Sequence, residues 1–106
     1  MPRLPNDWAA PHIAALARGE RVQFRPVGGS MKPIIESGDL VEARPVDREP
    51  RRQDVVLVQV DKFTYIHLIH DVKFEDGRRQ FLIGNNRGGR NGWVPREAIY
   101  GLVKKC

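Results

Sequence analysis

The chain has 106 residues, of which 41% are hydrophobic and 29% charged, a balance typical of one folded domain and unlike that of a disordered chain. Its 18 Lys and Arg residues outnumber its 13 Asp and Glu residues, which gives a formal net charge of +5 and brings anionic partners into consideration. The basic residues are spread along the sequence without a dense run or a nucleic-acid-binding motif. We therefore expect a solvated basic surface rather than nucleic-acid binding.

A single cysteine, Cys106, excludes an internal disulfide and a cysteine-rich metal site, and it fits a reducing compartment. No apolar stretch approaches the roughly 20 residues that are needed to span a bilayer, and the N-terminus has no signal-peptide core. The sequence thus predicts a soluble, cytoplasmic domain.

Residues 1–20 are expected to form an N-terminal helical segment, followed by one compact domain over residues 21–106. The alanine-rich stretch 8–17 predicts a short helix, with Asn6 or Asp7 as its N-cap and Gly19 as its stop. Trp8, Ile13 and Leu16 are expected to form its buried stripe.

The rest of the chain predicts short strands. Apolar and polar residues alternate over residues 21–27, and further strands are expected over residues 40–46, 63–72, 80–83 and 98–104. The apolar, β-branched run 55–60 is expected to be a central strand covered on both faces. Turns are predicted at 61–62 and 75–78, an irregular loop at 84–92 and one helical turn at 94–97. The fold class predicted is mainly β, with a curled, partly open barrel-like sheet and one short N-terminal helix.

The most informative stretch is residues 28–41, with the sequence Gly-Gly-Ser-Met-Lys-Pro-Ile-Ile-Glu-Ser-Gly-Asp-Leu-Val. It resembles the Gly-Ser-Met-x-Pro element, followed by Gly-Asp and an apolar strand, that carries the nucleophile in type I signal peptidases and LexA-like self-cleaving repressors. Similar elements follow in the family's order at residues 53–56, 65–69, 81–86 and 99–103. The resemblance covers residues 22–103 and implies a fold of the LexA and signal peptidase type.

The resemblance further implies that Ser30 is a nucleophile and His67 its general base, as in the catalytic subunit of the eukaryotic and archaeal signal peptidase. The signature there is His-Arg-Val or His-Arg-Ile, whereas this chain has Leu68 in place of the arginine. A serine hydroxyl needs a base within about 2.6 to 3.2 Å, and histidine, with an ordinary pKa of about 6.5, suits that role. Such a mechanism requires no metal and no organic cofactor.

Other residues are expected to support this pair. Gly28 and Gly29 permit the close approach of a substrate backbone, and the backbone N–H of Ser30 is expected to stabilise the oxyanion. Gly28 stands where many relatives carry a serine. Met31 is expected to line the core or the substrate cleft.

Pro33 and Asp39 are expected to be structural, with the Asp39 carboxylate accepting nearby backbone N–H groups in the turn before the next strand. Asn85 stands where the histidine-type relatives have the aspartate that supports the imidazole. Asn85 can hold the ring in place without compensating its charge, and Asp71 is left open as a substitute.

Strand alternation helps to choose between two histidines. His67 shares a face with Tyr65 and Ile69, and His70 has the opposite face, so an undistorted strand presents only one of them to Ser30. The family position favours His67, and His12 and His70 are expected to be structural or exposed.

Three functions follow as hypotheses. The first is a soluble serine endopeptidase that cleaves an extended segment of a protein or peptide substrate by a Ser-His mechanism, with small residues preferred near the cut as in the superfamily. The second is a catalytically degenerate module that binds a peptide or partner protein, motivated by Asn85, Gly28 and Leu68. The third, nucleic-acid binding, rests on net charge alone. Self-cleavage is not expected, because only a short helix precedes Ser30.

Overall fold

The computed structural model describes residues 8–28 and 31–106, and the statements below concern these residues. The elements in chain order are α1 (Ala10–Ala17), β1 (Val22–Phe24), β2 (Val41–Arg44), β3 (Val55–Val60), β4 (Phe63–Glu75), β5 (Arg78–Gly84), β6 (Arg90–Pro95), the 3₁₀ turn η1 (Arg96–Ala98) and β7 (Ile99–Lys105). The prediction of a mainly β chain with one N-terminal helix is confirmed.

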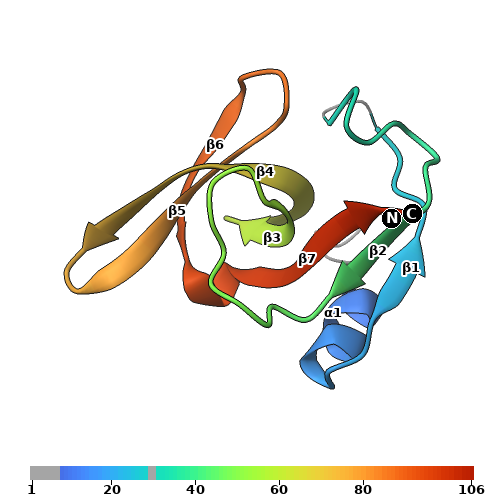
Figure 1. Ribbon diagram of the computed structural model, residues 1–106, viewed down its shortest axis with the longest axis horizontal. Coiled ribbons are helices and arrows are strands. Elements are labelled where there is room, and N and C mark those ends of the chain that lie inside the picture. Colours follow the sequence, from blue (N-terminus) through green and yellow to red (C-terminus); the bar gives the residue numbers. More distant parts are fainter. Residues whose placement is uncertain (1–7, 29–30) are drawn as a thin grey trace.

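All seven strands belong to one antiparallel sheet with the order β1-β2-β7-β3-β4-β5-β6. The last strand, β7, lies between β2 and β3 and so joins the N-terminal part of the sheet to the meander β3-β4-β5-β6. The sheet curls, and the long β4–β5 hairpin projects to one side (Figure 1). No pairing among the described strands joins β1 to β6, so the sheet is open.

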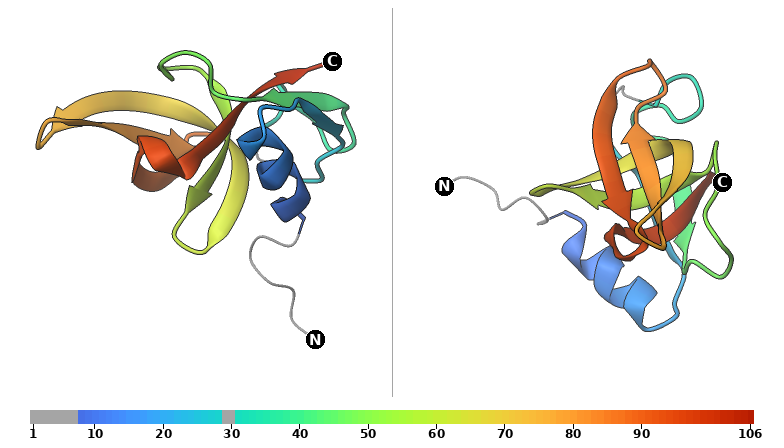
Figure 2. Two further views of the ribbon diagram at one scale, coloured as in Figure 1. Left: turned by 90° about the horizontal axis from the view of Figure 1, so that it is seen from below. Right: turned by 90° about the vertical axis from the view of Figure 1, so that its left-hand side faces the viewer.

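Helix α1 packs against one side of the sheet, on β7 and β1 (Figure 2). Pro11 lies in its first turn, where a missing N–H costs nothing, and Gly19 ends it with a positive φ of 85°. The predicted caps Asn6 and Asp7 lie outside the described residues. Leu16 is buried over Gly101, where an added Cβ would come within 3.0 Å of Leu16 Cδ1. Gly101 therefore lets the helix approach the sheet closely.

Two apolar clusters form the core, one on each side of the curled sheet. The first includes Leu16, Leu57 and Ile66, and the second includes Val56, Val58, Ile69 and Phe81. Strand β3 contributes to both clusters and has β7 and β4 as its neighbours. This confirms the prediction that residues 55–60 form a central strand covered on both faces.

The structure corrects the prediction for residues 84–97. Part of the expected loop and the first half of the expected helical turn belong to β6, which pairs with β5 through Phe81↔Val94 and Ile83↔Gly92. The second half lies in the 3₁₀ turn, which begins at Arg96. The run is rich in glycine, asparagine and arginine and so lacks an apolar alternation. Backbone hydrogen bonds to β5 hold this edge strand in place, and they do not depend on side-chain type.

Strands β4 and β5 also continue beyond the predicted ends, up to a turn at Asp76 and Gly77, both with positive φ. The expected turn at this place is confirmed. Within the part of the chain that the structure describes, no helix has the length and apolar character that crossing a membrane requires.

Candidate active site

A cavity of about 470 Å³ lies where the start of the helix, the end of β1, the loop after β1 and strand β4 come together. Gly28 and Met31 line it from the loop, and His67 lines it from β4. Ser30 and Gly29 lie outside the described residues. Gly28 and Met31, the described residues before and after this pair, therefore share a cavity with His67, which was predicted as the base.

The His67 ring has a defined orientation. It is buried, with 5% of its surface exposed, and its Nδ1 atom lies 2.6 Å from the carbonyl oxygen of Ile66. Because a carbonyl oxygen only accepts hydrogen bonds, Nδ1 carries the proton and Nε2 is the unprotonated nitrogen of the neutral ring. This is the tautomer that a general base needs.

The surroundings of His67 also favour its neutral form. Burial lowers the pKa of His67 below the ordinary value of 6.5; the Ile66 carbonyl opposes this shift, and the neighbouring His70 adds to it. The ring stacks on Tyr65 at a centroid distance of 4.6 Å, so the predicted common face of these two residues is confirmed. At neutral pH the imidazole is uncharged and able to accept a proton.

His70 lies at an irregularity of β4. The register between β4 and β5 shifts between Ile69 and Asp71, so simple alternation does not hold through His70. Its Nε2 atom lies 2.8 Å from the backbone oxygen of Asn85, to which it donates. The partner of His70 is thus the loop after β5, in agreement with the structural role expected for it.

Asn85 and Asp71 have partners away from the His67 ring. The side-chain oxygen of Asn85 accepts hydrogen bonds from the amides of Arg87 (2.8 Å) and Gly89 (2.9 Å) and shapes the loop that follows β5. Asp71 accepts from the amide of Val72 and lies 4.0 Å from Arg52. The described group that hydrogen-bonds to His67 Nδ1 is the backbone carbonyl of Ile66, which no side-chain motif in the sequence indicated.

Short hydrogen bonds tie the two ends of the loop that carries residue 30. The amide of Gly38 donates to Pro26 O (2.8 Å), and Arg25 donates to Gly38 O (2.8 Å). Gly28, with a φ of 120°, donates its amide to Ser37 Oγ at 3.2 Å. Since that amide already has a partner, it is not a free donor for an oxyanion.

The expected supporting residues hold this loop. Asp39 Oδ2 accepts from the amide of Glu36 at 2.8 Å, and this bond, followed by Lys105, lowers the pKa of the Asp39 carboxyl. Its predicted bracing role is confirmed. Met31 is buried in the core and also lines the cavity, and a bond from the Ile35 amide to Met31 O closes the turn that contains Pro33.

Two features of the site were not predicted. Asn86 donates its side-chain amide to Lys32 O at 2.8 Å and so connects the loop after β5 to the loop of residue 30. His12 lines the cavity and stacks on Phe24 at 4.4 Å. In the sequence, only its place in the Gly-Asn-Asn element indicated a role for Asn86, and no pattern indicated that His12 lies at the cavity.

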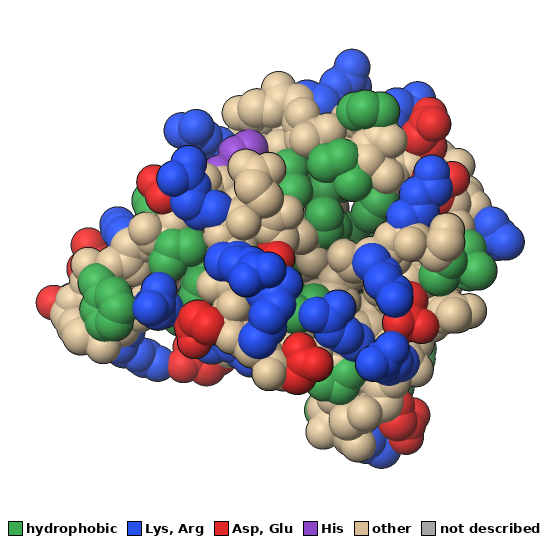
Figure 3. All heavy atoms as spheres, in the orientation of Figure 1, with side chains coloured by type: hydrophobic (Ala, Val, Ile, Leu, Met, Phe, Trp, Pro, Cys, Tyr) green, Lys and Arg blue, Asp and Glu red, His purple; other side chains and the backbone are tan. Residues whose placement is uncertain are grey.

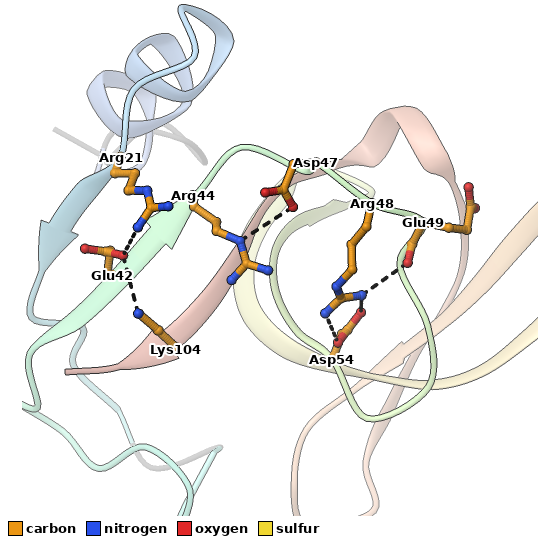
Figure 4. Close-up of polar contacts among 8 residues, drawn as sticks. All are labelled: Arg21, Glu42, Arg44, Asp47, Arg48, Glu49, Asp54 and Lys104. Atoms are coloured by element: carbon orange, nitrogen blue, oxygen red, sulfur yellow. Dashed lines mark hydrogen bonds and ion pairs between the residues drawn. The ribbon is translucent and has the colours of Figure 1, made fainter.

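The basic surface expected from the composition lies partly over β2, β7 and the loop before β3, where Lys and Arg side chains gather (Figure 3). Carboxylates accompany them: Glu42 lies between Arg21 and Lys104, and Asp54 receives two bonds of 2.8 Å from Arg48 (Figure 4). This surface is a network of ion pairs rather than a continuous cationic patch.

Among the described residues, no group of three or more His, Cys, Asp or Glu side chains is arranged to hold a metal ion. Comparisons with protein-family models, curated proteins and solved structures find no match for this chain. The fold and the site define a class in coarse terms: a mainly β domain with an open antiparallel sheet and a cavity that contains a buried, neutral histidine.

Proposed function

We propose that the chain is a serine endopeptidase of the type I signal peptidase and LexA-like superfamily, which cleaves a peptide bond in an extended protein segment. The observation that carries this proposal is the shared cavity: His67, with Nδ1 fixed by the Ile66 carbonyl, lines the same space as Gly28 and Met31, which flank residues 29 and 30 in the sequence. The Ser-Met-x-Pro element supplies the nucleophile.

The proposed chemistry proceeds in two halves. Ser30 Oγ attacks the scissile carbonyl while His67 Nε2 takes its proton, and the imidazolium then protonates the leaving amine. A water molecule, deprotonated by the same nitrogen, then attacks the acyl-enzyme; the bond to Ser30 Oγ breaks, the imidazolium returns its proton to Oγ, and the second product leaves as the acid. The backbone N–H of Ser30 is the expected oxyanion donor, because the Gly28 amide is bound to Ser37.

The proposed enzyme is expected to be slow. The Ile66 carbonyl orients the ring, but a neutral dipole stabilises the imidazolium less than a carboxylate does. In serine proteases, exchange of the triad aspartate for asparagine lowers kcat by about 10⁴. A covalent probe that reports one turnover is therefore a better assay than product formation.

The test is labelling of the pure protein with a fluorophosphonate, followed by mass spectrometry. We expect one adduct, on Ser30, which is absent in Ser30→Ala and strongly reduced in His67→Gln. His70→Gln is the matched control, since the His70 ring bonds to Asn85 O and should leave labelling unchanged. Labelling of Ser30 that is unaffected by His67→Gln would contradict the proposed pair.

A second candidate is a catalytically degenerate module that binds an extended peptide without cleaving it. Two observations favour it: the Gly28 amide is occupied within its own loop, and the partner of His67 Nδ1 is a carbonyl rather than a carboxylate. Peptide binding by wild-type protein that is not labelled at Ser30 would support this module against the enzyme.

A further inference from the structure

We infer that the cavity beside His67 binds a bulky apolar side chain, preferably an aromatic one, of an extended peptide. The inference rests on the proposed function, which places the peptide at this site, and it adds the class of substrate. The resemblance implies small residues near the cut. The walls and the size of this cavity favour large ones.

One wall is aromatic. The rings of Trp8 and Phe24 lie 6.0 Å apart at an angle of 52°, and His12 stacks on Phe24 at 4.4 Å. Tyr65, stacked on His67, also lines the cavity. Aromatic rings pair favourably with another ring in tilted or offset arrangements, so these walls suit an incoming aromatic side chain.

The described lining combines buried apolar side chains with two side chains of opposite charge. Met31, Ile35 and Ile66 line the cavity and are all buried. Arg25 and Glu36 are the charged side chains of the described lining; they have opposite signs, and Arg25 donates to Gly38 O. Because these two charges are opposite and burial favours the neutral form of His67, the described lining has no net charge that would select a charged side chain.

The size of the cavity separates large from small side chains. An apolar cavity of about 150 Å³ is sufficient to bind benzene, and this one measures about 470 Å³. An alanine side chain would fill only a small part of this cavity and would make few van der Waals contacts with the residues that line it. At the rim, Val27 is 88% exposed and adds apolar surface that an entering side chain would cover.

The chain offers an internal reporter of binding. It has two tryptophans, and Trp93 lies against Lys73 outside this cavity, so the variant Trp93→Phe leaves Trp8 as the only tryptophan, in the cavity wall. We would combine Trp93→Phe with Ser30→Ala to prevent turnover. Capped hexapeptides of glycine and serine with one variable residue, phenylalanine, leucine, alanine or glutamate, are then titrated while Trp8 emission is recorded.

We expect the phenylalanine and leucine peptides to shift Trp8 emission and to bind about tenfold or more tightly than the alanine peptide. Val27→Phe should fill the mouth of the cavity and remove this difference. Ile34→Phe is the matched control, since Ile34 is 42% exposed on the same loop and does not line the cavity. Far-UV circular dichroism verifies that both variants are folded.

Equal or tighter binding of the alanine peptide, or no binding of any peptide, would overturn the inference. Sedimentation that shows a dimer, dissociated by Val27→Phe, would instead assign the cavity to a second copy of the chain and overturn it as well. Binding of the phenylalanine peptide without fluorophosphonate labelling of wild-type Ser30 would refute the proposed peptidase activity and support the apolar side-chain site. Cleavage with a preference for alanine would support the enzyme and refute the pocket.

Discussion

Replacing Gly84 by alanine should destabilise the domain, because the structure leaves no room for a Cβ atom at this position. An added Cβ would overlap the carbonyl oxygen of Gly89 and would lie 2.7 Å from His70 Cδ2. The His70 ring is held by its bond to Asn85 O, and Gly89 O accepts from the Asn85 amide at 2.8 Å. The loop after β5 would therefore have to move away from the strand.

The expected loss is about 3 kcal/mol. Overpacking typically costs about 1 to 3 kcal/mol, and the upper end applies because a backbone carbonyl cannot rotate away as a flexible side chain can. Weakening the bond between the Asn85 amide and Gly89 O adds about 1 kcal/mol or less. For a domain of this size, such a loss lowers Tm by roughly 10 to 20 °C.

The assay is thermal and urea unfolding of wild type and Gly84→Ala. Gly77→Ala is the control. Gly77 has a φ of 76°, and apart from its chain neighbours no heavy atom of the described residues lies within 4 Å of the place that a methyl group would take there. The cost of this substitution is therefore that of the left-handed backbone, about 1 kcal/mol. A Tm for Gly84→Ala at or above that of Gly77→Ala would refute the reasoning, since it would mean that the loop after β5 can move away from the added methyl group at little cost in free energy.

Four further results are expected. Because burial lowers the pKa of His67, Ser30 labelling should persist as the pH falls through 6.5 and decline only in more acidic buffer; a decline centred above pH 6.5 would contradict this. As the pH falls, the His67 side chain takes up a proton in the unfolded chain before it does so in the folded one. The free energy of unfolding of wild type should therefore decrease relative to that of His67→Gln as the pH falls below 6.5. Burial alone would raise the pKa of Asp54, but hydrogen bonds from Arg48 and the Arg51 amide outweigh it and lower the pKa. Asp54→Asn should therefore reduce the urea midpoint at pH 7, and the difference in midpoint between wild type and variant should narrow as the pH falls through that lowered pKa. A difference that stays constant with pH would contradict this prediction. Phe81→Ala, at a fully buried ring, should cost about 3 to 5 kcal/mol in urea unfolding, and a loss below about 1 kcal/mol would show that the ring does not anchor the second cluster.

The sequence predicted those parts of the fold in which local pattern and tertiary burial agree. Strand β3 occupies the predicted residues 55–60, because a run of β-branched apolar residues suits a strand covered on both faces. The Asp76-Gly77 turn and the bracing by Asp39 were also predictable, since each depends on residues close in the sequence.

The parts that were missed depend on the backbone or on distant contacts. Strand β6 is held by main-chain pairing to β5, which leaves little trace in residue type. The same holds for the Ile66 carbonyl at His67, because every residue carries a carbonyl and only the folded geometry selects one. The register shift at His70 likewise removed the alternation from which its direction was predicted.

By itself, the sequence determined a mainly β domain with its principal strands and turns, because hydrophobic periodicity and turn chemistry depend on residues that are close in the chain. The pairing of Ser30 with His67 stays a prediction. The tertiary structure decided which groups meet: His12 on Phe24, Asn86 on Lys32, and the cavity that His67 shares with Gly28 and Met31. These contacts join residues far apart in the chain, and their distances are fixed only when the sheet curls and the helix closes over it.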